Sequence, residues 1–311
     1  MDLRQLCMQY LCQNQHFARQ THQKFQYSVN RWERAIGHLS PDVEPADFQL
    51  FRQSMLSSGL SPHSIEQTVY DIKVLLTAAG KEVSTGKPLR KPRPSPVVPD
   101  PLAIGKVFRV SDIAIWPLED ASVWWKGFLG IGLWTCLRLQ DLLRIRWPDI
   151  QNGWLTITPE KTRRHGVVQE IPVGRIQSLL DTLPQRKSRV LDCGKSMKQL
   201  RREMKRMCQS AGVAYFTPHD LRRAGLTMWS IANPEAARIL HGCGKKDVMQ
   251  HYLSPRKILE DTAPKVKLPD CMLPADLREQ SEQQEEEMLA KFRNATPEQR
   301  ELLIKLSRQL G

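Results

Sequence analysis

Four side chains between positions 138 and 252 of this 311-residue sequence have the chemistry and the order needed to cut a phosphodiester without metal. They are Arg138, the pair His219 and Arg222, and Tyr252. Two guanidinium groups can hold the non-bridging oxygens of a phosphate as negative charge builds up in the transition state. A phenol aligned with the leaving oxygen can then act as the nucleophile. Each residue alone carries little information, but the ordered set predicts nucleophilic attack on a phosphate diester.

His219 and Arg222 follow a strong signal for the start of a helix. The hydroxyl of Thr217 can cap the helix, and Pro218 suits the first helical position. Residues three apart lie on one helical face, so both side chains should project near an N-terminus that favours phosphate. The pair is predicted to contact the phosphate or relay a proton. Alone, this histidine would more often be a capping or core residue.

Arg138 is predicted to lie on a helix with Asp141 three residues later on the same face. A carboxylate at that spacing can orient the guanidinium through an ion pair. Asp141 is therefore predicted to support Arg138, and a surface salt bridge is the alternative interpretation.

Two strands joined by a basic loop are predicted between these motifs, over 155–158 and 167–172. The loop region carries Lys161, Arg163 and Arg164. Cleavage needs an acid that protonates the departing 5′-oxygen, and the three cations compete for this role on sequence grounds. The alternative is a basic hairpin that only contacts the DNA backbone.

A basic segment rich in proline divides the chain at 83–110. Prolines at this density exclude a helix or a central strand, so an extended linker is expected. The linker cations are predicted to lie along DNA phosphates, with a solvated tether as the alternative; they include Lys87, Arg90, Lys91 and Arg93. Residues 1–82 are predicted to be all-helical, since Ser61-Pro62 starts a segment with apolar residues at helical spacing.

After the linker, residues 111–265 are predicted to form a larger and mostly helical domain. The apolar stretch from Val123 to Leu137 is too short to span a bilayer and is predicted to be a buried helix. More helices are expected near 174–182 and 196–211, and after the start signal Asn233-Pro234. The expected fold class is mainly α (α+β), with one small antiparallel β-hairpin.

The net charge of +13 and the pI near 9.6 indicate a polyanionic partner, because lysine and arginine release the counterions condensed on nucleic acid. An ordinary basic protein would also fit the charge alone. The seven cysteines include no Cys-x-x-Cys pair, which argues against a disulfide framework or a zinc site and for a reducing compartment. The first thirty residues lack the apolar core of a signal peptide. A soluble intracellular protein with no membrane partner is therefore expected.

The ordered set resembles the catalytic residues of the tyrosine recombinases of the phage integrase family. The resemblance is strong over roughly 111–265 and weak over 1–82, which it identifies as a catalytic domain and a core-binding domain that clamps DNA. It implies that Lys161 is the hairpin lysine that acts as general acid. The family usually has glycine where this chain has Cys136, while Asp141 keeps the family's acidic position.

The chain departs from the family pattern between Leu240 and Gly244. The family usually has Leu-Gly-His nine residues before the tyrosine, and the histidine hydrogen-bonds the phosphate. A gap-free count from Tyr252 puts Cys243 at that position, with His241 two residues earlier. A thiol is a weak donor. Either Cys243 fills the position, which the spacing favours, or His241 swings into the role.

The resemblance implies a site-specific DNA recombinase or integrase, typical of mobile elements. Tyr252 would form a 3′-phosphotyrosyl intermediate with double-stranded DNA, and neither metal nor cofactor would be needed. The alternatives are an enzyme like type IB topoisomerase, or a catalytically weak DNA-binding homologue of a recombinase. The Cys243 position is the feature that favours the weak binder.

The resemblance also implies partners and a location. Four protomers would assemble on two DNA sites, accessory DNA-bending proteins are candidate partners, and the protein would act in the cytoplasm at the nucleoid. Residues 266–311 are expected to be a helical C-terminal tail with an apolar leucine stripe near its end. A contact with a neighbouring protomer and a solvated or self-docked helix are both open for this tail.

Overall fold

The computed structural model divides the chain into two units, residues 1–95 and 96–311. It describes residues 1–90, 98–117, 120–185, 188–192, 194, 197–242 and 254–273. None of the helices among these residues is long and apolar enough to cross a membrane.

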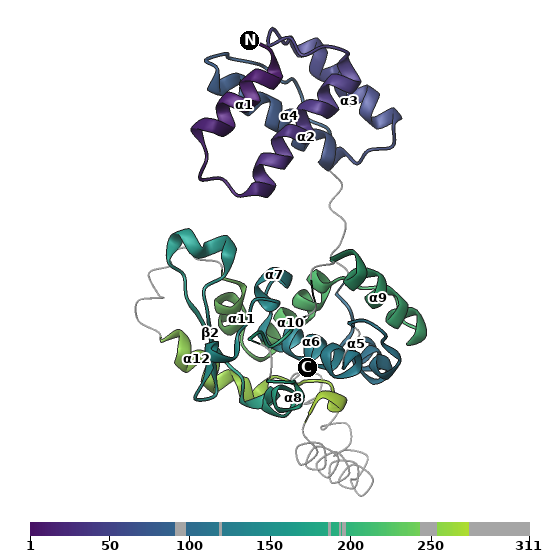
Figure 1. The fold of residues 1–311 in the computed structure, drawn as a ribbon, viewed down its shortest axis with the longest axis vertical. Helices are drawn as coiled ribbons and strands as arrows, with labels where there is room; N and C mark the ends of the chain where they lie inside the picture. The colour runs from purple at the N-terminus through teal and green to yellow at the C-terminus, as the bar shows by residue number, and fades with distance from the viewer. Residues whose placement is uncertain are drawn as a thin grey trace, which may run out of the picture. The chain divides into compact units, whose positions relative to one another are not determined.

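The N-terminal unit is a bundle of four helices (Figure 1): α1 (Leu3–Gln13), α2 (Arg19–Ile36), α3 (Pro45–Ser57) and α4 (Pro62–Ala78). Helix α4 packs against the other three. Its first turn is capped by the Ser61 hydroxyl, which accepts from the Ser64 amide at 3.3 Å. Aromatic side chains such as Trp32, Phe48 and Phe51 fill the core. The prediction of an all-helical N-terminal domain is confirmed.

The predicted linker is only partly extended. Its first residues are fixed to the bundle, because Arg52 Nη1 donates to the Thr85 carbonyl at 2.6 Å and the Leu89 amide donates to Glu66 Oε1 at 3.0 Å. The expectation of an extended chain is wrong over α5 (Pro101–Arg109), where Pro101 occupies the first turn, a position that tolerates proline.

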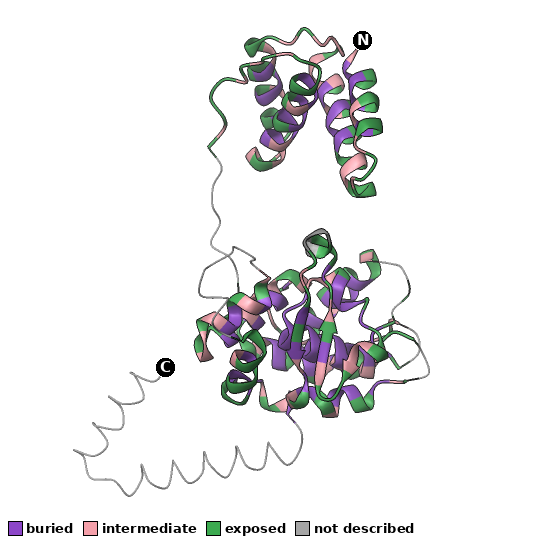
Figure 2. Ribbon diagram, turned by 90° about the vertical axis from the view of Figure 1, so that its left-hand side faces the viewer, coloured by how far each residue is buried: buried purple, intermediate pink, exposed green. Residues whose placement is uncertain are grey.

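The C-terminal unit is built around α6 (Ala121–Thr135), the predicted apolar helix, which is buried along most of its length. Helices α10 (Pro218–Ala232) and α8 (Gln177–Thr182) pack against it. Figure 2 shows buried residues concentrated at the centre of this unit. The other helices are α7 (Leu139–Leu142), α9 (Met197–Ser210), α11 (Pro234–His241) and α12 (Pro255–Thr262).

A small antiparallel sheet with strand order β1-β2-β3 lies in the same unit, next to α11 and α12. Its strands are β1 (Ile150–Gln151), β2 (Trp154–Ile157) and β3 (Gln169–Pro172). Leu155 pairs with Ile171, and both are buried. The predicted hairpin is confirmed, and the short β1 adds a third strand to it. Short 3-10 turns connect the elements: η1 (Val110–Ile113), η2 (Trp147–Asp149), η3 (Glu160–His165), η4 (Gly174–Ile176), η6 (Ala263–Lys265) and η7 (Asp270–Met272).

The C-terminal unit extends beyond residue 265. Val266, Leu268 and Met272 are buried in its core, and η7 packs against α5. The predicted boundary is therefore wrong by at least eight residues, because the apolar side chains of 266–273 complete the core instead of opening a tail. Residues 274–311, which include the predicted leucine stripe, lie outside the described residues.

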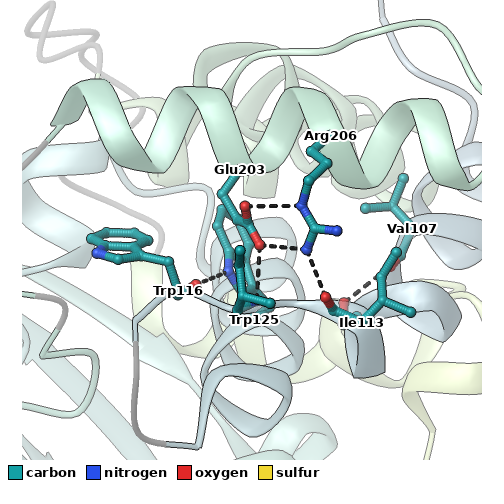
Figure 3. Close-up of polar contacts among 8 residues, drawn as sticks. Val107, Ile113, Trp116, Trp125, Glu203 and Arg206 are labelled. Atoms are coloured by element: carbon teal, nitrogen blue, oxygen red, sulfur yellow. Dashed lines mark hydrogen bonds and ion pairs between the residues drawn. The ribbon is translucent and has the colours of Figure 1, made fainter.

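Helix α9 is fixed to the segment before α6 by a polar network (Figure 3). The Glu203 carboxylate, which is 6% exposed, accepts from the Ile115 amide at 3.0 Å and from Arg206 Nη2 at 2.7 Å. Arg206 also donates to the Ile113 carbonyl at 2.6 Å. This network leaves the basic side chains of the opposite face exposed; they are Lys198, Arg201, Arg202 and Lys205.

Gly225 allows α10 to cross α6 at very close range. A Cβ atom at this position would lie 2.0 Å from the Leu133 carbonyl oxygen and 2.8 Å from Cys136 Sγ. The first contact is with backbone, which cannot rotate away as a flexible side chain can. The crossing therefore depends on glycine.

We expect Gly225→Ala to destabilise the C-terminal unit by about 3 kcal/mol or more, at the upper end of what overpacking costs. Chemical denaturation of the full chain, followed by the tryptophan signal of the C-terminal unit, measures the change. Gly174→Ala is the matched control, since no atom lies within 4 Å of its Cβ position. Equal denaturation midpoints for the two variants would show that α6 and α10 can move apart without loss of stability.

Candidate active site

His219 and Arg222 lie in the first turns of α10, as predicted. The Thr217 hydroxyl accepts from the Asp220 amide at 3.2 Å, and Asp220 Oδ2 accepts from the Thr217 amide at 2.9 Å. This capping box fixes the start of the helix. His219 is exposed, whereas Arg222 is buried with 3% exposure.

The Arg222 guanidinium joins three segments that are far apart in the sequence. Its Nη1 atom donates to the Cys136 carbonyl at 2.5 Å, and its Nη2 atom donates to the His241 carbonyl at 3.0 Å. The end of α6 and the end of α11 are thereby tied to the first turns of α10. Side-chain rotation of Arg222 would break both bonds, so the guanidinium is held in one orientation.

Cys136 ends α6 in the left-handed conformation, with φ 52° and ψ 26°. Glycine is the usual residue for this conformation, and a non-glycine residue held there is strained by an amount on the order of 1–3 kcal/mol. The turn directs the Cys136 carbonyl to Arg222. Burial raises the pKa of the Cys136 thiol, so this cysteine is a packed neutral group.

Arg138 lies outside a helix, which corrects the sequence prediction. Its backbone is extended, with φ −68° and ψ 148°, and it forms the N-cap of α7. The helical spacing that linked Arg138 to Asp141 therefore does not apply. The physical reason is the left-handed turn at Cys136, which separates α6 from α7.

Asp141 positions the segment that carries Lys161. Its carboxylate is 2% exposed, and Oδ1 accepts from the Glu160 amide at 2.9 Å. Glu160 begins η3, and Lys161 is the next residue, exposed to solvent. The predicted action of Asp141 on Arg138 stays a prediction.

Two histidines have several of the predicted cationic residues as electrostatic neighbours. The pKa of His241 is lowered first by burial and then by the positive charges of Arg222, Arg138, His219 and Lys161. The pKa of His219 is also lowered, first by burial and then by arginines that include Arg222 and Arg138. Five predicted site residues thus lie within electrostatic reach of one another, although the sequence distributes them over more than a hundred positions.

Gln169 is a site residue that sequence reasoning misses. Its Nε2 atom donates to the Ile239 and Leu240 carbonyls, both at 3.2 Å. These bonds attach the C-terminal turn of α11 to β3 and fix the position of His241. A glutamine in a short strand carries no sequence signal for this role, because its partners lie 70 and 71 residues away.

The remaining predicted site residues are described only in part. Tyr252 and Cys243 lie outside the described residues, as do Lys91, Arg93 and the side chain of Arg164. Arg163 is exposed and lies 4.0 Å from Glu160 in an ion pair. Lys87 and Arg90 are exposed in the N-terminal unit.

We expect the imidazoles of His219 and His241 to titrate below their ordinary pKa of about 6.5 in the free protein. Both would be neutral at pH 7, and stability would fall as the pH drops below about 6.5, because the unfolded chain then binds more protons. Histidine NMR signals recorded against pH measure this, with assignments from His219→Gln and His241→Gln. Titration midpoints above pH 6.5 would contradict the cationic surroundings of the two histidines.

Comparison with known proteins gives the family. The sequence model of the phage integrase family matches residues 111–230, a range that contains Arg138, Lys161, His219 and Arg222. No curated protein matches the chain. Residues 111–230 thus carry the sequence pattern of the phage integrase family, whose members are tyrosine recombinases.

Solved structures with the same fold include DNA-bound integrases. A lambda integrase (75–356) dimer bound to a COC′ core site is 17% identical, with a TM-score of 0.63, and the match covers 79% of this chain and 96% of that one. A lambda integrase tetramer bound to a Holliday junction is 16% identical, with a TM-score of 0.62 and coverage of 82% and 78%. A variant of the Tn1549 transposon integrase (82–397), in complex with a circular intermediate DNA, is 15% identical, with a TM-score of 0.64 and coverage of 82% and 95%. At these identities the likeness shows the fold alone.

Proposed function

We propose that the protein is a site-specific DNA recombinase that cuts and rejoins strands through a phosphotyrosyl intermediate. The observation that carries this proposal is the gathering of Arg138, Lys161, His219, Arg222 and His241 around one site. A group of fixed positive charges and donors is what a phosphoryl transition state requires.

Tyr252, Lys161 and the two arginines each have a role in the proposed reaction. The Tyr252 hydroxyl loses its proton to solvent as its oxygen attacks the scissile phosphorus, and the bond from phosphorus to the 5′-oxygen breaks. Lys161 gives its proton to that oxygen, which leaves a 3′-phosphotyrosyl link and a free 5′-hydroxyl. Arg222 and Arg138 hold the non-bridging oxygens, and Arg222 is oriented for this in advance by its two carbonyl partners.

The two histidines act as neutral hydrogen-bond donors to the phosphate. Their lowered pKa values favour the neutral imidazole, which still carries one N–H donor. His241 has Arg222, Arg138, His219 and Lys161 as electrostatic neighbours, which supports His241 as the residue that fills the irregular position of the family motif. This choice differs from the spacing argument, which favours Cys243.

The 5′-hydroxyl of a partner strand reverses the reaction and joins the new strands. The phosphodiester energy is kept in the tyrosyl link, so no metal or nucleotide takes part in the proposed cycle. The DNA-bound dimer and tetramer of lambda integrase support assembly of several copies of this chain on two DNA sites. The exposed basic face of α9 and the cations Lys87 and Arg90 are proposed to contact the DNA backbone.

Covalent trapping tests the proposed function. The full chain is incubated with nicked duplexes that carry the DNA flanking its gene, and a denaturing gel is used to detect a protein–DNA adduct. We expect an adduct without added metal, and recombinant products from paired sites. Binding without an adduct would indicate a weak homologue, and relaxation of supercoils without strand exchange would indicate a topoisomerase.

A further inference from the structure

A second basic site lies beside the sheet, apart from the residues assigned to cleavage. It is a pocket of about 370 Å³ that is open to solvent. Among the side chains that line it are four arginines and two threonines, namely Arg144, Arg146, Arg163, Arg189, Thr156 and Thr158. The proposed reaction gives none of these six a chemical step.

Two of the pocket arginines face each other directly. Arg146 and Arg189 are partners in an isolated antiparallel bridge. The bridge is flanked by hydrogen bonds from the Val190 amide to the Ile145 carbonyl at 3.0 Å and from the Trp147 amide to the Ser188 carbonyl at 3.4 Å. A pair of this kind brings the two side chains close together on one face. Like charges directly opposite each other are destabilising, so this arrangement calls for an anion between them.

Two carboxylates, those of Asp141 and Asp149, also line the pocket, and each accepts a hydrogen bond from a backbone amide. Asp149 Oδ2 accepts from the Arg146 amide at 2.8 Å, and Asp141 Oδ1 accepts from the Glu160 amide. Glu160 forms an ion pair with Arg144. Within the part of the chain that the structure describes, no ion pair joins the guanidinium of Arg146 or Arg189 to a carboxylate. The pocket therefore has an excess of positive charge at this pair.

We propose that the pocket binds a phosphate group, and that its source is a backbone phosphate of bound DNA away from the scissile one. Guanidinium forks match the geometry of phosphate oxygens. Thr156 lies in β2 and Thr158 directly follows it; both are exposed and line the pocket, so their hydroxyls can add neutral donors. The DNA source rests on the proposed function, whereas the phosphate chemistry rests on the pocket alone.

The salt dependence of DNA binding tests the proposal. Affinity of the full chain for a duplex is measured between about 50 and 200 mM salt, where each phosphate contact contributes about 0.9 to the slope of log affinity against log salt. We expect Arg146→Ala and Arg189→Ala each to reduce the slope, and the double variant to reduce it by about 0.9, the contribution of the one phosphate that the pair holds. Arg109→Ala is the matched control. It removes one positive charge from an exposed arginine on α5, and this arginine does not line the pocket.

A second arm identifies the source of the phosphate. Inorganic phosphate and pyrophosphate are titrated into the wild type and the double variant, and thermal unfolding is followed. Stabilisation of the wild type alone, with unchanged DNA slopes, would assign the pocket to a free anion and overturn the DNA source. If the salt slopes of DNA binding are unchanged and neither anion stabilises the protein, the proposed phosphate site is wrong, even if the wild type binds and cuts DNA. If the wild type binds phosphate but not DNA, the proposed function is wrong, whereas the phosphate site remains supported.

Discussion

Tyr252→Phe should eliminate the covalent protein–DNA adduct while DNA binding remains nearly unchanged. The substitution removes only the phenolic oxygen, so the nucleophile is lost and the aromatic ring is kept. Adducts are detected on denaturing gels with a nicked duplex, and affinity is measured on the intact duplex. Tyr252 lies outside the described residues, so its assignment as the nucleophile is based on the order of the sequence motifs.

Tyr215→Phe is the matched control for this experiment. Tyr215 is a second tyrosine, four residues before His219, and its side chain is exposed in part. Its partial burial raises its pKa, which disfavours the phenolate form. It precedes the histidine motif, whereas the nucleophile of the family follows it. We expect this variant to form adducts as the wild type does. An adduct in Tyr252→Phe that disappears only when Tyr215 is also changed would move the nucleophile to Tyr215.

The signals for helix starts are the most reliable part of the sequence. Ser61-Pro62, Thr217-Pro218 and Asn233-Pro234 each open a helix in the structure, with the polar side chain as the cap. These signals are local, since the cap and the amide it satisfies lie within three residues. Local chemistry of this kind can be predicted without knowledge of the fold.

The same local reasoning fails where the tertiary structure decides. Proline density predicts an extended chain over 101–109, but Ile104, Val107 and Phe108 are buried in the core as one helical face. The sequence places Arg138 on a helix because nothing in it marks Cys136 as a left-handed residue in the way that glycine would. In both segments, burial against distant parts of the chain compensates for a local cost. The cost is that of proline-rich sequence in a helix at 101–109 and that of a left-handed backbone at Cys136.

A sequence pattern can propose the residues of a site, but it cannot give the contacts that support them. The order of the arginines and the histidine leads to Arg138, His219 and Arg222. The bonds that hold Arg222 connect it with a carbonyl 86 residues away and another 19 residues away. A main-chain carbonyl is present at every residue, so no sequence pattern distinguishes the two that Arg222 uses.

Arg222→Ala should slow cleavage by on the order of a thousandfold or more, as loss of a charged group that stabilises a phosphoryl transition state does. The substitution also removes the donor to the buried Cys136 carbonyl, at about 1–3 kcal/mol, and the donor to the part-buried His241 carbonyl. Single-turnover cleavage of a nicked duplex measures the rate, and thermal unfolding shows whether the variant is folded.

Arg222→Lys separates charge from geometry in the same assay. Lysine keeps the positive charge but lacks the planar fork that reaches two carbonyls while facing a phosphate. We therefore expect the lysine variant to remain folded and to cleave far more slowly than the wild type. Arg238→Ala controls for charge, because Arg238 lies on α11 with a side chain that is 70% exposed and forms an ion pair with Glu235, three residues earlier. A lysine variant with the wild-type rate would mean that charge alone is required at this position, and that the two carbonyl bonds serve the fold and not the reaction.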